Sequence, residues 1–140
     1  MIINQIKKFI KDNCPLVDGY TINVNYLGEK KRKYTLEQEP HAPIIKRYAD
    51  GGSLRQFVFA FASRELFGEK EIENLEVSRF YEEFAEWLES TSEKKILPKL
   101  DPGKTALRLE VLTGGYLLSN TNTSARYEIQ CRLIYRQERI

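Results

Sequence analysis

Alternating apolar and polar side chains predict two strands near the start of the chain. Residues 20–26 alternate in this way, and residues 34–39 do so again after the charged run at 29–33. A period of two places successive side chains on opposite faces of a strand, so we predict a hairpin with a charged tip. In its second arm the side chains are expected to face inward and outward in turn, in the order Tyr34, Thr35, Leu36 and Glu37.

The most apolar segment, residues 54–63, has apolar side chains at both parities. Phe57, Phe59 and Phe61 alternate there with valine or alanine. This pattern is typical of a strand that is covered on both faces, or covered on one face and packed in an assembly on the other. A helix is the competing interpretation, because Phe57 and Phe61 also stand four residues apart. We favour the central strand of the core, with the three phenylalanines facing one layer.

Two other segments show the period of a helix. Over residues 2–12, isoleucines and one phenylalanine lie opposite lysines, and Pro15 ends this helix near Asn13. From about residue 72 to residue 92 an apolar face lies opposite solvated glutamates. The side chains assigned to that face, with Phe80, Phe84 and Trp87 as the core of the helix, are Leu75, Phe80, Phe84, Trp87 and Leu88.

The last third of the chain again has the period of a strand. Alternation over residues 107–111 is interrupted at Gly114 and Gly115, where a bulge or bend is expected, and residues 116–138 complete a long hairpin. The order helix, hairpin, strand, helix, hairpin predicts an α+β fold. We expect one domain over residues 1–140, with two helices packed on an antiparallel sheet of about five strands.

Charge and cysteine content narrow the possible partners. Lysine and arginine number 22 against 20 acidic residues, a net charge of +2 that is too even to favour nucleic acid or an anionic membrane as the main partner. The longest apolar run is far shorter than the roughly 20 residues that span a bilayer, so no membrane partner is expected. Cys14 and Cys131 are expected to be reduced thiols, with one bridge between them as the alternative.

No catalytic, cofactor-binding or metal-binding residue is predicted, and the chain is not expected to be an enzyme. The run Gly103–Thr105 resembles the end of a phosphate-binding loop, but Pro98 stands where that motif needs a glycine, so a turn entering a strand is favoured. His41 is the only histidine and lies between two prolines, in what we expect to be an exposed loop. The glutamates of the second helix are interpreted as a solvated outer face.

Four segments of the chain, taken together, are familiar. They are INVNYLGEKKRKYTLEQEP, YADGGSLRQFVFAFASRELFG, FYEEFAEWLES and LPKLDPGKTALRLEVLTGGYLLSNTNTSARYEIQCRLIY. In this order they resemble a family of small proteins from long-tailed phages and prophages of Gram-positive bacteria, called minor capsid proteins. That family is similar to the tail terminators, also called tail-to-head joining proteins.

The resemblance implies an α+β, tail-terminator-like subunit that forms a ring of six copies. Such a ring caps the tail tube, stops its polymerisation and docks it to the head, so the mechanism is geometric and needs no cofactor. The implied partners are other copies of the chain, the tail tube protein and the head connector protein, while genome DNA passes through the lumen without specific recognition. The implied location is the tail–head junction of the virion, after synthesis in the cytoplasm of the bacterial host.

Loop tips are the candidate protein-contact or lumen residues. They are Glu29, Lys30, Lys31, Arg32, Lys33, Asn120 and Asn122. Two other hypotheses stay open at this point. A nucleic-acid-binding adaptor of phage or prophage origin, using residues 30–33, predicts salt-dependent affinity for DNA. An enzyme acting through Cys14, Cys131 or Lys104 predicts a pocket with clustered groups of perturbed pKa.

Overall fold

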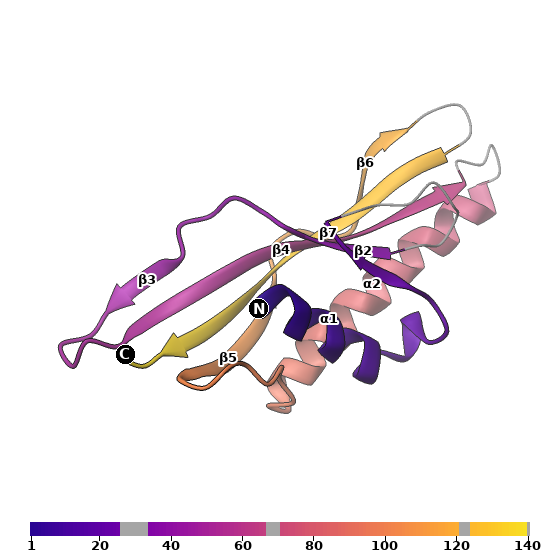
Figure 1. The fold of residues 1–140 in the computed structure, drawn as a ribbon. Coiled ribbons are helices and arrows are strands. Elements are labelled where there is room, and N and C mark those ends of the chain that lie inside the picture. Colours follow the sequence, from indigo (N-terminus) through magenta and orange to yellow (C-terminus); the bar gives the residue numbers. More distant parts are fainter. Residues whose placement is uncertain (26–33, 67–70, 121–123, 140) are drawn as a thin grey trace.

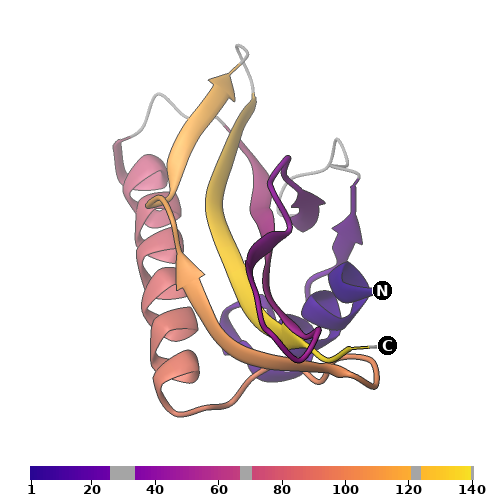
Figure 2. The same cartoon turned by 90° about the vertical axis from the view of Figure 1, so that its left-hand side faces the viewer.

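The described strands join one twisted sheet, and the helices α1 (Ile2–Asn13) and α2 (Glu71–Glu93) pack on the same face of it (Figure 1). The computed structural model describes residues 1–25, 34–66, 71–120 and 124–139, without the side chains of residues 65, 66, 71–74, 116–120 and 124. The fold is α+β, as predicted. Figure 2 shows α2 running along one side of the curved sheet.

In the described parts of the chain, seven strands make up the sheet, in the order β1-β2-β4-β7-β5, with β3 paired to β4 and β6 paired to β7. The central strands β4 and β7 have 14 residues each and pair antiparallel, from Ser53 opposite Gln137 to Leu66 opposite Ser124. A short 3-10 helix, Pro15–Val17, follows α1. The strands are β1 (Ile22–Val24), β2 (Tyr34–Gln38), β3 (Ile44–Arg47), β4 (Ser53–Leu66), β5 (Lys104–Val111), β6 (Tyr116–Asn120) and β7 (Ser124–Gln137).

The predicted antiparallel sheet of about five strands is wrong in two respects. First, β1 and β2 pair parallel, with Ile22 opposite Tyr34 and Val24 opposite Leu36, so the sheet is mixed and these strands do not form a hairpin. Alternation has the same period in either strand direction, which is why the pattern could not show this. Second, β3 and β6 are additional strands, each too short for its own alternation to be recognised.

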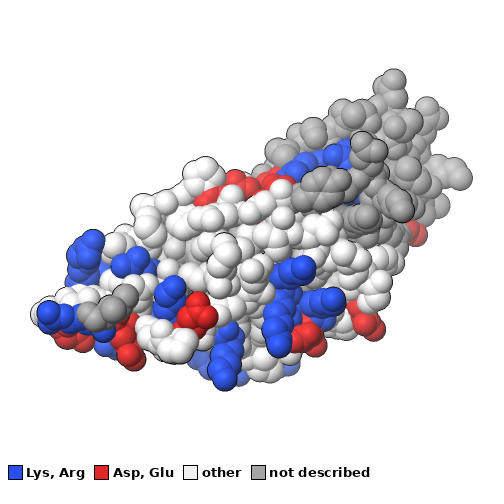
Figure 3. All heavy atoms as spheres, viewed as in Figure 1, with Lys and Arg blue, Asp and Glu red and all other residues white. Residues whose placement is uncertain are grey.

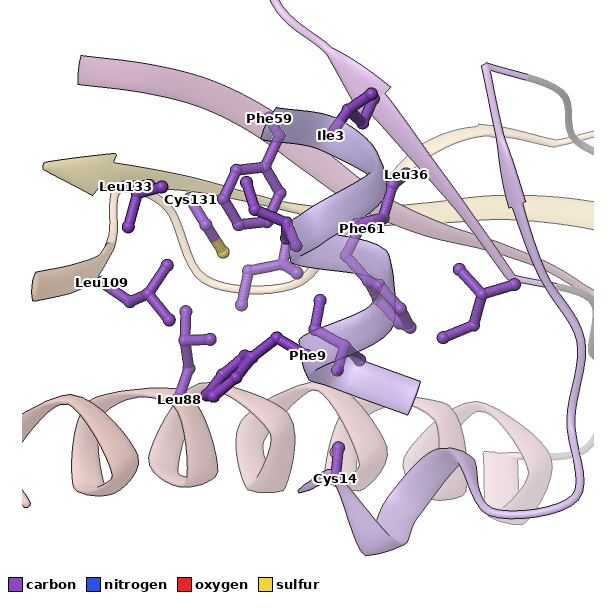
Figure 4. Packing of buried hydrophobic residues seen from close by; sticks show 14 of the residues in the cluster. Ile3, Phe9, Cys14, Leu36, Phe59, Phe61, Leu88, Leu109, Cys131 and Leu133 are labelled. Carbon is purple, nitrogen blue, oxygen red and sulfur yellow. The ribbon is translucent and has the colours of Figure 1, made fainter. Parts of the chain in front are cut away.

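The most apolar segment is a strand, so the competing helix interpretation is wrong. Phe57, Phe59 and Phe61 all lie on the helix-covered face of β4, with exposed fractions of 8%, 0% and 0%. Figure 4 shows Phe59 and Phe61 between the sheet and the helices, in the same cluster as Phe9 of α1 and Leu88 of α2. The Phe61 ring stacks on Phe84 of α2, with 4.4 Å between ring centroids. These contacts attach both helices to the central strand.

The buried face of α2 is rotated from the predicted one. Phe84 and Leu88 are fully buried as expected, and Phe80 and Trp87 pack against the core while partly exposed. Leu75, however, is 58% exposed, so its assignment to the core is wrong. Seven residues separate Leu75 from Glu82, which places Leu75 on the solvated line of the helix. Tyr81 is buried as well, which the helical pattern of apolar residues does not indicate.

Tyr81 attaches α2 to the sheet through its hydroxyl group. The side chain is buried, and the hydroxyl lies 2.6 Å from Ser63 Oγ of β4 while donating to the Tyr127 carbonyl of β7 at 3.1 Å. A buried hydroxyl without such partners would be costly, so these bonds permit a polar residue at this position. Tyrosine has both an apolar ring and a polar hydroxyl group, so the period of apolar residues alone does not identify Tyr81 as buried.

Both cysteines are buried free thiols, as predicted for a reduced chain, and no bridge joins them. Burial raises the pKa of the Cys14 thiol, and desolvation raises the pKa of Cys131 strongly. Figure 4 shows Cys131 beside Leu133 and Phe59 in the core. Within the described residues, no helix is both long and apolar enough to span a bilayer.

Candidate functional site

The loop tips proposed as contact or lumen residues cannot be placed in the structure. Residues 29–33 and Asn122 lie outside the described residues, and for Asn120, at the end of β6, the side chain is not described. Their assignment therefore stays a prediction. The described residues instead offer another candidate site, on the sheet face opposite the helices.

This face, here called the helix-free face, is the side of the sheet on which no helix of the described residues packs. Cross-strand register places Ala60 of β4 between Glu37 and Gln130, and Ala62 between Thr35 and Glu128. Both alanines are fully buried although they face away from the helices. The sequence had indicated that these small residues admit close packing by another layer. In the structure, charged or polar residues of the neighbouring strands lie beside both alanines.

Arg126 of β7 and Glu37 of β2 form an ion pair across β4. The guanidinium donates two hydrogen bonds to the carboxylate, at 2.6 Å and 3.2 Å. Arg126 also donates to Glu128 Oε1 at 3.2 Å, and the exposed fraction of Glu128 is only 3%. A buried carboxylate is tolerated only with a close cationic partner. Arg126 therefore holds two carboxylates in place and bridges three strands.

A second cluster lies further along the same face. Glu110 of β5 accepts from Arg132 Nε at 2.7 Å and from Arg108. Arg132 Nη1 also donates to the Gln56 side-chain oxygen of β4 at 3.3 Å. The two clusters thus link β2, β4, β7 and β5 through side chains as well as backbone, which stiffens this face of the sheet.

The charges on this face shift one another's pKa. Burial disfavours the ionised form of Glu110, but hydrogen bonds from Arg108 and Arg132 outweigh it and hold the pKa of this carboxyl below its usual value. Glu39 lies near two other carboxylates, and burial together with repulsion from Glu128 and Glu37 raises its pKa. For Arg126, the hydrogen bond to Glu37 raises the pKa further, so its guanidinium stays charged.

The surface that results is charge-balanced. Three arginines, Arg108, Arg126 and Arg132, face three carboxylates with which they pair. Figure 3 shows positive and negative side chains adjoining one another along the molecule, rather than one uniform basic surface. Such a surface offers polar complementarity to a protein but little free positive charge to a phosphate backbone.

The sequence pattern does not reveal these clusters, for a specific reason. Arginine and acidic or amide residues do alternate with apolar ones in β7, which signals a strand with one polar face. The partners, however, come from β2, β4 and β5, and pairing between strands follows from register, which the alternation does not determine.

His41 and the Gly103–Thr105 run do not join this face. His41 is half-buried rather than exposed as predicted, because residues 39–43 follow the edge of β4. Its Nδ1 donates to the Glu39 carbonyl at 2.6 Å, and its ring meets Phe57 edge-on. Gly103 forms a turn with φ +85° and β5 starts at Lys104, so a turn entering a strand is confirmed.

Within the described residues, no group of three or more histidine, cysteine, aspartate or glutamate side chains is placed to hold a metal ion. Comparison of the sequence with models of known protein families and with curated proteins finds no match. The functional argument therefore depends on the chain's own residues and on the arrangement of its surfaces.

Proposed function

We propose that the chain is a structural subunit of a phage virion, a tail terminator that forms a ring at the tail–head junction. The resemblance of four ordered segments suggests this role, and the α+β fold with both helices on one sheet face is compatible with it. The observation that carries the proposal is the helix-free face. It is broad, stiffened by cross-strand ion pairs and balanced in charge, which suits contact with other macromolecules better than chemistry on a small molecule.

In the proposed ring, the helix-free face is suited to the lumen. DNA passing through a terminator must neither bind tightly nor be repelled. Free lysine or arginine side chains would bind phosphates and release counterions, and unpaired carboxylates would repel them. Arg126 and Arg132 are instead engaged by carboxylates of the same face. The tail tube protein and the head connector protein would meet the two ends of the ring.

Electron microscopy of the protein mixed with tail tubes of its own phage tests the proposal. Rings should appear at the ends of tubes, and tubes polymerised in the presence of the protein should stop growing. Tube protein polymerised alone is the control. Tubes that stay uncapped and keep growing would overturn the proposal. Salt-dependent binding of duplex DNA under the same conditions would favour a nucleic-acid-binding adaptor instead.

A further inference from the structure

A groove opens between β5 and the segment that connects it to α2. Its volume is about 580 Å³, and it combines an apolar lining with cationic side chains. The apolar residues are Leu97, Pro98, Leu100, Pro102, Ala106 and Leu107. The cationic residues are Lys95, Lys99 and Lys104, and we call this site the lysine groove.

The lysine groove carries unbalanced positive charge. Within the described residues, none of its three lysines forms an ion pair. Asp101 also lines the groove, but it accepts a hydrogen bond from Gln5 Nε2 of α1 at 2.8 Å. A lysine just beyond a helix often serves only to offset the helix dipole. That explanation fits Lys95 but not Lys99 or Lys104, which lie beyond the last turn.

The opposite charge lies along the outer side of α2. Four exposed glutamates follow one another at spacings of four, three and four residues, and so form one line on the helix. We call this line the acidic stripe, and it consists of Glu82, Glu86, Glu89 and Glu93. No ion pair of the described residues involves any of them. Like charges four residues apart destabilise a helix by roughly 0.2–0.5 kcal/mol per pair, so the stripe opposes helix stability in the isolated chain.

An exposed apolar side chain continues the acidic stripe. Leu75 lies on the same line of α2 and is 58% exposed, with the exposed Arg79 between it and Glu82. A line that combines carboxylates with an exposed leucine matches a groove that combines lysines with an apolar lining. The buried side of α2, which includes Phe84 and Leu88, is already occupied by the core.

We propose that the lysine groove of one copy of the chain receives the acidic stripe of α2 from a second copy. This inference rests on the proposed ring and names its subunit contact. The groove lies beyond the C-terminal end of α2, whereas the stripe follows exposed positions along that helix, where Glu89 and Glu93 also border β5. Two different patches that fit each other form a head-to-tail contact, and repeated head-to-tail contacts generate a ring when the rotation closes.

The contact leaves the Arg126 cluster of the helix-free face unobstructed. The lysine groove belongs to residues 95–107 and the acidic stripe to α2, whereas Arg126, Glu37 and Glu128 lie on the opposite face of the sheet. The stripe approaches the second cluster at Glu89 and Glu93, which line a hollow together with Glu110. A ring joined in this way has both a charge-driven subunit contact and a separate charge-balanced surface.

Cysteine cross-linking tests the contact directly. Lys99→Cys and Glu86→Cys place one thiol in the lysine groove and one in the acidic stripe, while the native thiols of Cys14 and Cys131 are buried. Under mild oxidation, a mixture of the two variants should form mixed dimers at least about tenfold faster than either variant alone. Glu86→Cys mixed with Lys8→Cys, an exposed position on α1, is the matched control. Equal rates in all mixtures would overturn the proposal.

Charge reversal gives an independent test. Lys95→Glu/Lys99→Glu and Glu82→Lys/Glu86→Lys should each weaken self-association roughly tenfold or more in sedimentation experiments, because each creates like-charge contacts. A mixture of the two double variants should restore association between unlike copies, because the reversed groove then meets the reversed stripe and the native groove meets the native stripe. As a control, Lys8→Glu/Lys11→Glu on α1 changes the net charge by the same amount as Lys95→Glu/Lys99→Glu and should leave self-association unchanged. Failure of the mixture to recover association would overturn the contact.

The outcomes also separate this contact from the proposed function. Rings that cap tail tubes with every reversed variant would retain the terminator and reject the contact. Specific cross-links without any capping of tubes would retain the contact and reject the terminator. If Lys95→Glu/Lys99→Glu abolishes binding of duplex DNA but leaves self-association unchanged, the groove binds nucleic acid and the proposal is wrong.

Discussion

Arg126 shows how much the helix-free face depends on single residues. Its guanidinium is the cation that contacts both Glu37 and the nearly buried carboxylate of Glu128. Without this cation Glu37 and Glu128 would lose a shared partner, and Glu128 could not regain the water that it lost on folding. The folded subunit therefore needs Arg126 to accommodate Glu37 and Glu128, independently of any assembly.

Replacing Arg126 tests that dependence. Arg126→Met keeps much of the side-chain volume but removes the cation, and we expect it to lower the free energy of unfolding by about 1.5–3 kcal/mol, the usual contribution of hydrogen bonds to charged groups. Urea denaturation followed by circular dichroism measures the loss. Arg136→Met is the control, because the pair of Arg136 with Asp50, at 3.5 Å, is exposed and contributes at most about 1 kcal/mol. Equal losses in the two variants would contradict the buried-charge explanation.

The lowered pKa of Glu110 leads to a second prediction for a single residue, on how the stability of the fold depends on pH. Hydrogen bonds from Arg108 and Arg132 lower its pKa in the folded chain, despite burial, so its ionisation stabilises the fold. That contribution is present above the unfolded pKa of about 4.3 and is lost as the pH falls through the lower folded value. Glu110→Gln should therefore be less stable than wild type at pH 7, and the two should converge as the pH falls below 4.

Glu39 is the control for this pH series, because its pKa is shifted in the opposite direction. Burial and repulsion raise its pKa, so its ionisation costs stability, and that cost appears as the pH rises through the folded value. Glu39→Gln should be as stable as wild type at low pH and slightly more stable at pH 7. Parallel pH profiles for both variants would show that neither carboxyl is perturbed as described.

At the scale of elements, Gly115 controls how closely the connection between β5 and β6 approaches α2. A Cβ atom added at Gly115 would lie 2.2 Å from Cβ of Tyr81, far inside a van der Waals contact. At Gly114 an added Cβ would meet no atom within 4 Å. The glycine pair that predicted a bend therefore consists of one position that needs glycine for space and one that does not.

Alanine substitution distinguishes these two positions. We expect Gly115→Ala to shift the chain away from Tyr81 and to cost about 1–3 kcal/mol of stability, the usual penalty for overpacking. Gly114→Ala should change the free energy of unfolding by much less. Thermal denaturation of both variants measures the difference. A stable Gly115→Ala variant would mean that the connection moves freely relative to α2.

The elements also show what the sequence pattern can and cannot determine. Both helices and the β4 strand were predicted close to their observed bounds, because an amphipathic period or an apolar run is a local property. The parallel pairing of β1 and β2 was missed because alternation carries no direction. The ion pairs of the helix-free face were missed because they depend on register across four strands, and Leu75 was misplaced because apolar character alone does not fix which side of α2 is buried.

For the whole molecule, the net charge of +2 results from acidic and basic residues that are concentrated in different segments of the chain. The segment Glu71–Glu93 contains eight glutamates and one arginine, whereas residues 94–104 contain four lysines and one aspartate. Separated charges of opposite sign attract one another between copies, whereas a net charge near zero gives little overall attraction to DNA. The asymmetry therefore favours ordered self-association over general binding to nucleic acid.

Salt dependence is the consequence of this asymmetry that is easiest to measure. Charges at an exposed contact are screened over about 10 Å at 0.1 M salt and over about 3 Å at 1 M. Self-association through the lysine groove and acidic stripe should therefore weaken as sodium chloride rises from 0.1 M to 1 M, as measured by sedimentation equilibrium. The fold should change little over the same range, because Arg126 and Glu128 are partly or almost fully removed from water. Self-association that tightens with salt would indicate an apolar contact, and the lysines would then have no part in joining the subunits.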